Sequence, residues 1–483
     1  MSSSLKQQTV SGIIWSSLQR FGVMGISFIS NIILARLLSP EDYGCLGLLA
    51  IFIAVSNVFI YGGFVSALIQ KQNPTQTDYS TVFYWNIATS VFFFIILYIC
   101  APYISEFYKI ELLTDVLRTQ SLILLINALS IVQLNILRKK LLFKKISLIQ
   151  LIAACASILT TIILAYNGWG IWSLVFQQII NSLVITIILW CICNWRPSLV
   201  FSKKSFTELF SYGSYLLLSD LLNSICDNIQ GLIIGRKFSS NIMGYYSQAK
   251  KLEEVPTTTI SYVVQQVTFP VYSKIQNDKD KLYMGVKKSL CMMNFINFPL
   301  MILLIAIAEP LFLILFSEKW LPSVPYFQIL CIAGLVNCMQ SVNYQVVCAV
   351  GKSKKIFKWN IFKRLIGISL IFSGMYWGVE GILTGMVISF YVTYIVNSLV
   401  SKNITGYTTI QQIKDAIPTL IISIAAYLIT LITNAIHINS LILIILTKVL
   451  IFISTYTLLM YSTKRPEFVE FTKIVKQFYK HDR

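Results

Sequence analysis

Fourteen apolar stretches, joined by short connections, dominate this chain and decide what it can fold into. A helix needs ~20 largely apolar residues to cross the ~30 Å hydrocarbon core of a bilayer. The stretches are centred near residues 23, 56, 90, 126, 157, 182, 222, 265, 302, 336, 367, 391, 424 and 451. Because spans of this length take up more than half of the 483 residues, the sequence predicts an all-α polytopic membrane protein without a soluble domain.

The charged residues are few and unevenly distributed. They make up 12% of the chain, against ~25% in ordinary soluble domains. Of the 39 Lys and Arg residues, 29 lie in every second connection counted from the N-terminus, and the intervening connections hold 8. The positive-inside rule then places both termini in the cytoplasm. The net charge of +19 therefore indicates topology and contact with anionic membrane lipid, and we expect no nucleic-acid partner.

An internal repeat is visible at a constant offset of 200 residues. Placing residues 18–44 over residues 218–244 without a gap aligns identical residues at five positions, which are Leu18/Leu218, Ile33/Ile233, Arg36/Arg236, Ser39/Ser239 and Gly44/Gly244. Six spans per copy is an even number, so both copies would point the same way. We expect two pseudosymmetric six-helix lobes, residues 1–195 and 205–400, around a central cavity. Two extra helices would follow in residues 412–462, and residues 463–483 would form a basic amphipathic cytoplasmic tail.

Three separated blocks of sequence carry a family resemblance. The runs LARLLSPEDYGCLGLLAIF, GYYSQAKKLEEVPTTTISYVVQQVTFPVYSKIQND and EKWLPSVPYFQILCIAGL resemble Wzx-type polysaccharide (O-antigen or colanic-acid-like) flippases of the multidrug/oligosaccharidyl-lipid/polysaccharide exporter superfamily. The resemblance covers roughly residues 5–400. It implies a transporter that moves undecaprenyl-pyrophosphate-linked oligosaccharide across the bacterial inner membrane by alternating access. Such transport would serve lipopolysaccharide, capsule or exopolysaccharide biosynthesis, together with other polysaccharide-assembly proteins.

The first predicted span has one cation near its middle, Arg20, and this residue lies in a stripe of polar side chains. Arg20 lies ~12 Å into the membrane at 1.5 Å per residue, on the same face as Ser16, Ser27 and Asn31. A charge inside a span costs ~2.5–3.5 kcal/mol at the helix centre, so it implies a partner or a wet cavity. Since a guanidinium fork matches phosphate oxygens, Arg20 is a candidate to bind the pyrophosphate.

The seventh span carries a polar face of opposite sign. Asp220, Asn223, Asp227 and Gln230 are spaced 3, 4 and 3 apart and share one face. The 200-residue offset pairs Arg20 with Asp220. Two interpretations stay open: Asp220 or Asp227 binds H⁺ or Na⁺ and couples transport, or one of them forms a static ion pair with Arg20.

Other polar residues in the spans are weaker candidates. Gln265, Gln266, Asn337, Gln340 and Tyr344 suit sugar hydroxyls, and each is equally suited to an interhelical hydrogen bond. Arg36 and Arg236 end their spans on the predicted periplasmic side, where snorkelling to the interface is the favoured interpretation.

Catalysis finds little support in the sequence. The chain has only two histidines, and its ten cysteines show no metal-ligand spacing, so we expect no enzyme, metal site or cofactor apart from a coupling ion. A membrane polysaccharide polymerase is therefore disfavoured. The stronger alternative to a flippase is a cation-coupled multidrug antiporter of the same superfamily, whose cationic substrates would not call for Arg20.

Overall fold

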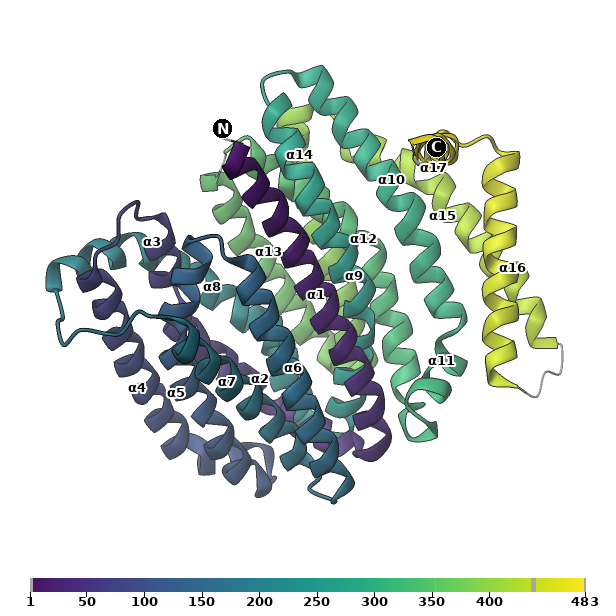
Figure 1. Ribbon diagram of the computed structural model, residues 1–483. Helices are drawn as coiled ribbons and strands as arrows, with labels where there is room; N and C mark the ends of the chain where they lie inside the picture. The colour runs from purple at the N-terminus through teal and green to yellow at the C-terminus, as the bar shows by residue number, and fades with distance from the viewer. Residues whose placement is uncertain (1–2, 352, 436–439, 482–483) are drawn as a thin grey trace. The chain divides into compact units, whose positions relative to one another are not determined.

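The computed structural model describes residues 3–351, 353–435 and 440–481, and all regular structure in these ranges is helical (Figure 1). The all-α class is therefore confirmed. The helices of the first half are α1 (Ser3–Leu37), α2 (Pro40–Tyr61), α3 (Phe64–Gln70), α4 (Gln76–Tyr108), α5 (Leu112–Lys139), α6 (Phe143–Tyr166), α7 (Ile171–Ile192) and α8 (Lys203–Lys237). Those of the second half are α9 (Ser240–Ile275), α10 (Lys279–Ala306), α11 (Ala308–Leu315), α12 (Ser323–Ala349), α13 (Ser353–Gly374), α14 (Gly378–Thr405), α15 (Thr409–Leu431), α16 (Leu441–Ser462) and α17 (Pro466–His481), with short 3₁₀ turns η1 (Glu318–Trp320), η2 (Met375–Trp377) and η3 (Ile432–Ala435).

The helices are long enough and apolar enough for a multi-pass membrane protein. Within the described ranges, eleven helical segments qualify as membrane spans by length and composition. One of these segments, residues 358–405, contains most of α13 and all of α14, while α8 and α9 have the length but are too polar to qualify. Each of the fourteen predicted centres lies in a separate helix of at least 22 residues. The number fourteen stays a prediction.

Capping boxes fix the starts of several helices and keep the connections short. Ser39 precedes α2, and its backbone N–H donates to Oδ2 of Asp42 at 2.8 Å while its side-chain oxygen accepts from the Asp42 N–H. Thr75 and Asp78 form the same box at the start of α4. Such boxes satisfy backbone donors that a helix start leaves free.

The chain divides into two compact units, Met1–Gly244 and Tyr245–Arg483. In the first unit α1 packs along α6, α7 packs along α5 and α6, and α4 packs along α5. Helix α8 packs along α2 in this unit. The sequence analysis assigned α8 to the second lobe, and the six-helix lobes of residues 1–195 and 205–400 stay a prediction.

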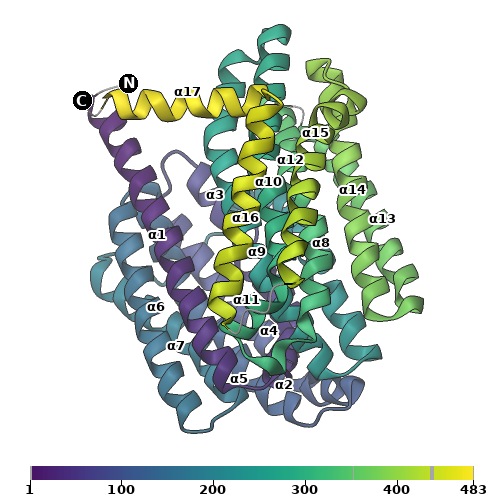
Figure 2. The same ribbon diagram turned by 90° about the vertical axis from the view of Figure 1, so that its right-hand side faces the viewer.

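The second unit is built around α12 and α14. Helices α10 and α14 pack along α12, α13 packs along α14, and α15 lies between α10 and α16. Helix α17 runs across the end of α16 rather than along it (Figure 2). Its Phe471 ring lies 5.4 Å from the ring of Phe295 in α10, and Glu470 pairs with Lys288. The tail of the chain thus forms an amphipathic helix anchored on α10.

Candidate functional site

Arg20 lies on a face of α1 next to the face that packs on α6. A Cβ on Gly22 would lie 2.8 Å from Cδ2 of Leu151, and the side chain of Gln19 donates a hydrogen bond to Gln150. Arg20 follows Gln19 directly, so it lies ~100° further round the helix. The Arg20 side chain is half-buried, as is Asn31 on the same face. The predicted polar stripe therefore lies on a face next to the packing face.

Helix α8 approaches α2 through glycine, on the helical face that also carries its acids. A Cβ on Gly231 would lie at ordinary contact distance, 3.4 Å, from the carbonyl oxygen of Gly47, whereas a Cβ on Gly235 would lie 1.9 Å from Cδ2 of Leu48 and would force that side chain to shift. Asp220 and Asp227 are exposed, and Gly231, four residues after Asp227, lies on the same face of α8. The two faces of opposite sign, on α1 and α8, thus belong to one compact unit. Whether the acids couple transport or pair statically with Arg20 stays a prediction.

The two arginines at the helix ends are exposed. Arg36 lies in the last turn of α1 and Arg236 in the last turn of α8. The guanidinium of Arg236 donates to the carbonyl oxygen of Phe107 at 3.0 Å and lies 4.9 Å from the centre of its ring. These contacts join the ends of α8 and α4 and give Arg236 a structural role.

The sequence-predicted polar residues of the second unit fall into two groups. On α9, Gln265 and Gln266 are exposed, and Gln266 donates to the Tyr262 hydroxyl at 2.8 Å. On α12, Asn337, Gln340 and Tyr344 are half-buried at helical spacing. Gln340 donates to Oδ1 of Asn337 at 2.6 Å, so the structure brings these two side chains together.

Lys363 and Asn397 join the α12 group and were missed by the sequence analysis. The basic residues Lys352 to Arg364 are typical of a cytoplasmic connection, and the structure instead places Lys363 within α13, which begins at Ser353. Lys363 is only 8% exposed, and its Nζ donates to Oδ1 of Asn397 at 2.7 Å. Asn397 in turn donates to the carbonyl oxygen of Gln340 at 3.4 Å. The flanking apolar residues Ile361, Phe362 and Leu365 were the available signal.

A narrow pocket opens beside this group. It measures about 10 Å³, room for one water-sized group. Its lining residues come from α12, α13 and α14, and they are Tyr344, Val347, Trp359, Asn360, Lys363, Asn397 and Val400. A buried ammonium beside such an opening can bind one oxygen of an anion.

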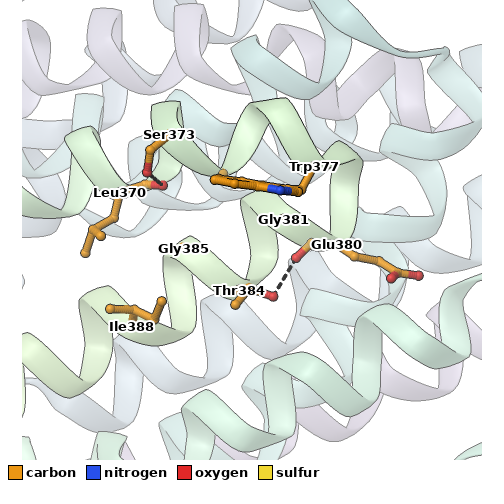
Figure 3. A pocket seen from close by; sticks show the side chains of 9 residues that line it. Leu370, Ser373, Trp377, Glu380, Gly381, Thr384, Gly385 and Ile388 are labelled. Atoms are coloured by element: carbon orange, nitrogen blue, oxygen red, sulfur yellow. Dashed lines mark hydrogen bonds between the residues drawn. The ribbon is translucent and has the colours of Figure 1, made fainter.

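A larger pocket, about 340 Å³, lies at the other end of α13 and α14 (Figure 3). The indole of Trp377 lies over Gly381, and the Glu380 side chain points away from the other lining residues. The helices meet closely here, since a Cβ on Gly374 would lie 2.2 Å from the Gly381 carbonyl oxygen. Trp377 is 75% exposed at this helix end, as is typical of aromatic residues at a membrane interface. The pocket contains none of the sequence-predicted site residues.

Metal-ligating side chains do not gather in the part of the chain that the structure describes. There, no three His, Cys, Asp or Glu residues lie where they could share a metal ion, and all ten cysteines are free thiols.

Comparison with known proteins identifies the family. The family model described as "Polysaccharide biosynthesis protein" matches residues 33–325, more than half of the chain. The chain belongs to this polysaccharide biosynthesis protein family. The match spans α2 to α11, and it includes α8 with Asp220 and Asp227 and most of the predicted repeat. The family resemblance drawn from the three sequence blocks is thereby confirmed.

Relatives of this polysaccharide biosynthesis protein carry related names. The chain is 27% identical over 370 residues to the teichuronic acid biosynthesis protein TuaB of Bacillus subtilis, covering 76% of this chain and 77% of that protein. It is 25% identical over 446 residues to the lipopolysaccharide biosynthesis protein WzxC of Escherichia coli, covering 87% and 88%.

Solved structures share the fold of this family member. The lipid II flippase MurJ in its inward closed conformation aligns with a TM-score of 0.78 at 17% identity, over 94% of this chain and all of that chain. An inward-facing multidrug resistance transporter of the MATE family aligns with a TM-score of 0.62, over 82% of this chain and 98% of that chain. At such identities the likeness establishes the fold, a multi-pass membrane bundle.

Proposed function

We propose that this chain is a flippase that moves undecaprenyl-pyrophosphate-linked oligosaccharide across the bacterial cytoplasmic membrane, for lipopolysaccharide, capsule or exopolysaccharide biosynthesis. The observation that carries the proposal is the combination of family and fold. A member of a polysaccharide biosynthesis family has, over 94% of its length, the fold of a lipid II flippase. The proposal assigns no catalytic step to the chain.

Substrate recognition divides between charge and hydrogen bonding in this proposal. Arg20 would bind the pyrophosphate, because its planar fork of donors can contact two phosphate oxygens at once. The sugars would be held by neutral polar side chains, which are Asn31, Gln265, Gln266, Asn337, Gln340 and Tyr344. Neutral groups suit a hydroxyl-rich ligand because they exchange hydrogen bonds without holding a charge in the membrane.

Transport would proceed by alternating access with the lipid tail left in the bilayer. A pyrophosphate cannot cross hydrocarbon unaided because the loss of its hydration is too costly. A polar path between helices replaces that hydration, and the polar faces of α1 and α8 are suited to line it. Asp220 or Asp227 would take up H⁺ or Na⁺ and link the ion gradient to the substrate.

A multidrug antiporter is the second candidate function. It is favoured by the exposed carboxylates of Asp220 and Asp227 on α8 and by the MATE-like fold. Cationic drugs would bind to these acids and would be repelled by Arg20 on α1.

Binding by the purified full-length protein separates the two functions. We expect saturable binding of undecaprenyl-pyrophosphate-linked oligosaccharide that excess undecaprenyl pyrophosphate competes away, and no comparable binding of the cationic dye rhodamine 6G. Dye binding without binding of the lipid-linked oligosaccharide would replace the flippase proposal by the antiporter.

A further inference from the structure

Lys363 is a buried cation whose partner is a neutral amide. Its ammonium donates at 2.7 Å to Oδ1 of Asn397, and only 8% of the residue is exposed. Within the described residues, none of the ion pairs includes Lys363. An ammonium has three N–H donors and the bond to Asn397 uses one of them, so two remain for a further ligand.

Asn397 holds the ammonium in place without neutralising it. Asn397 is itself buried, and its amide nitrogen donates to the Gln340 carbonyl oxygen at 3.4 Å. This bond turns the amide oxygen toward Lys363. A buried positive charge in a membrane protein is costly unless an anion or water balances it. The arrangement therefore keeps a positioned cation that no acid of the described residues neutralises.

The opening beside Lys363 admits one small atom group and no more. The pocket of about 10 Å³ holds one water-sized group, which is the size of a single oxygen of an anion. Asn360, one helical turn before Lys363, also lines it and offers a second donor. Trp359, 40% exposed, and half-buried Tyr344 line the same opening. Aromatic rings of this kind commonly lie at the level of lipid headgroups.

Further positive charge precedes the pocket in the sequence. Four lysines come shortly before Lys363, and Arg364 follows it; the four are Lys352, Lys354, Lys355 and Lys358. Basic clusters next to a span attract anionic headgroups. The segment that precedes Lys363 in the sequence is thus of a kind that attracts lipid phosphates.

We propose that Lys363, positioned by Asn397 and assisted by Asn360, binds a phosphate oxygen of a membrane lipid. Two lipids offer this chemistry. One is an anionic phospholipid of the surrounding leaflet, and the other is the pyrophosphate-bearing carrier lipid of the substrate. Only the second source rests on the proposed function, since it would make the pocket a subsite of the transport path.

Native mass spectrometry of the full-length protein in detergent tests the proposal. Phosphatidylglycerol, undecaprenyl pyrophosphate and zwitterionic phosphatidylcholine are added in separate arms, and the retained lipid is counted. We expect retention of at least one of the first two above the phosphatidylcholine background. Lys363→Met should weaken that retention about tenfold or more, because a charged hydrogen-bond donor is lost. Lys402→Met, which removes an exposed lysine in the last turn of α14 that does not line the pocket, should leave retention unchanged.

Asn397→Asp keeps the test decisive if Lys363→Met does not fold. The new carboxylate replaces the amide oxygen that lies 2.7 Å from the ammonium, so Lys363 becomes paired within the chain. Lipid retention should fall by a similar factor while the protein stays folded. Unchanged retention in Asn397→Asp, or wild-type retention no higher than for phosphatidylcholine, would overturn the proposal.

The two lipid arms identify the source. Preferential retention of phosphatidylglycerol assigns the pocket to the surrounding leaflet, and preferential retention of undecaprenyl pyrophosphate assigns it to the substrate. A protein that retains phosphatidylglycerol through Lys363 but never binds lipid-linked oligosaccharide would remove the flippase proposal and leave this site standing.

Discussion

Gly44 and Gly244 lie in reciprocal contact where the first turns of α2 and α9 meet. A Cβ on Gly44 would lie 1.8 Å from the carbonyl oxygen of Ser240, and a Cβ on Gly244 would lie 1.8 Å from the carbonyl oxygen of Pro40. The two glycines are 200 residues apart, and so are the residues that they meet, Pro40 and Ser240. This separation is the offset of the sequence repeat. Contacts that exchange in this way are those expected across a twofold axis. The repeat therefore brings equivalent turns against each other.

Replacing either glycine of this contact should destabilise the protein. We expect Gly44→Ala and Gly244→Ala each to cost about 1–3 kcal/mol, because the added methyl group overlaps a backbone oxygen that cannot move aside. Thermal unfolding in detergent measures the effect. Gly25→Ala in α1 is the matched control, since a Cβ there meets no atom within 4 Å. Equal unfolding midpoints for all three variants would contradict the contact.

Lys71 links the start of α4 to α8 and should contribute to stability. Its Nζ lies 3.1 Å from Asp78, which is nearly buried, and 3.0 Å from Glu208, which is 57% exposed. Burial opposes the charged amine, but hydrogen bonds to Glu208 and Asp78 outweigh it and raise the pKa of Lys71. The stabilisation is therefore complete at neutral pH and is lost only as pH rises above the ordinary lysine value.

Substitutions at this ion pair should have unequal effects. Lys71→Met should cost about 2 kcal/mol because it leaves the Asp78 carboxylate buried without its cation. Glu208→Gln should cost less than about 1 kcal/mol, since an exposed ion pair contributes little. Denaturation midpoints at neutral pH compare the two. A larger loss for Glu208→Gln than for Lys71→Met would contradict this assignment.

Polysaccharide export should require arginine at position 20, and lysine should not replace it. Arg20→Lys keeps the charge and loses the forked geometry, so export of polysaccharide in cells that depend on this chain should fall strongly. Arg20→Ala should abolish export. Membrane levels of each variant provide the control. Normal export by well-expressed Arg20→Ala protein would remove Arg20 from the mechanism.

The double variant of Arg20 and Asp220 separates coupling from a static ion pair. If the two residues merely neutralise each other, Arg20→Ala with Asp220→Asn should restore the export that each single change removes, because no unpaired charge remains. If Asp220 couples transport to an ion gradient, the double variant should stay inactive although it is folded and inserted. We expect the inactive result, and recovered export would contradict coupling through Asp220.

Much of the fold could be predicted from the sequence because spans are encoded locally. Runs of apolar residues long enough for a bilayer each became one helix, and even the polar helices α8 and α9 contain the centres predicted near residues 222 and 265. Gly44 and Gly244, one of the five identical pairs of the sequence repeat, lie where an added Cβ would overlap a backbone oxygen.

The sequence could not predict which cations are buried. Lys363 lies in a run of basic residues that is typical of a cytoplasmic connection, and only the packing of α13 on α14 places it against Asn397. Lys139, which is half-buried, lies in a similar run of basic residues, Arg138 to Lys145. Its Nζ donates to the Leu68 carbonyl oxygen at 3.0 Å and so caps the end of α3. Such contacts join residues far apart in the chain, and local patterns do not encode them.

Flipping by the purified protein in proteoliposomes tests the central claim most directly. Fluorescent undecaprenyl-pyrophosphate-linked oligosaccharide is placed in both leaflets, and a membrane-impermeant reagent quenches the outer leaflet. We predict that the inner-leaflet signal becomes accessible in vesicles containing wild-type protein, and stays protected both in protein-free vesicles and with Arg20→Ala protein. Protection that persists with folded, oriented wild-type protein under H⁺ and Na⁺ gradients of either direction would contradict the account.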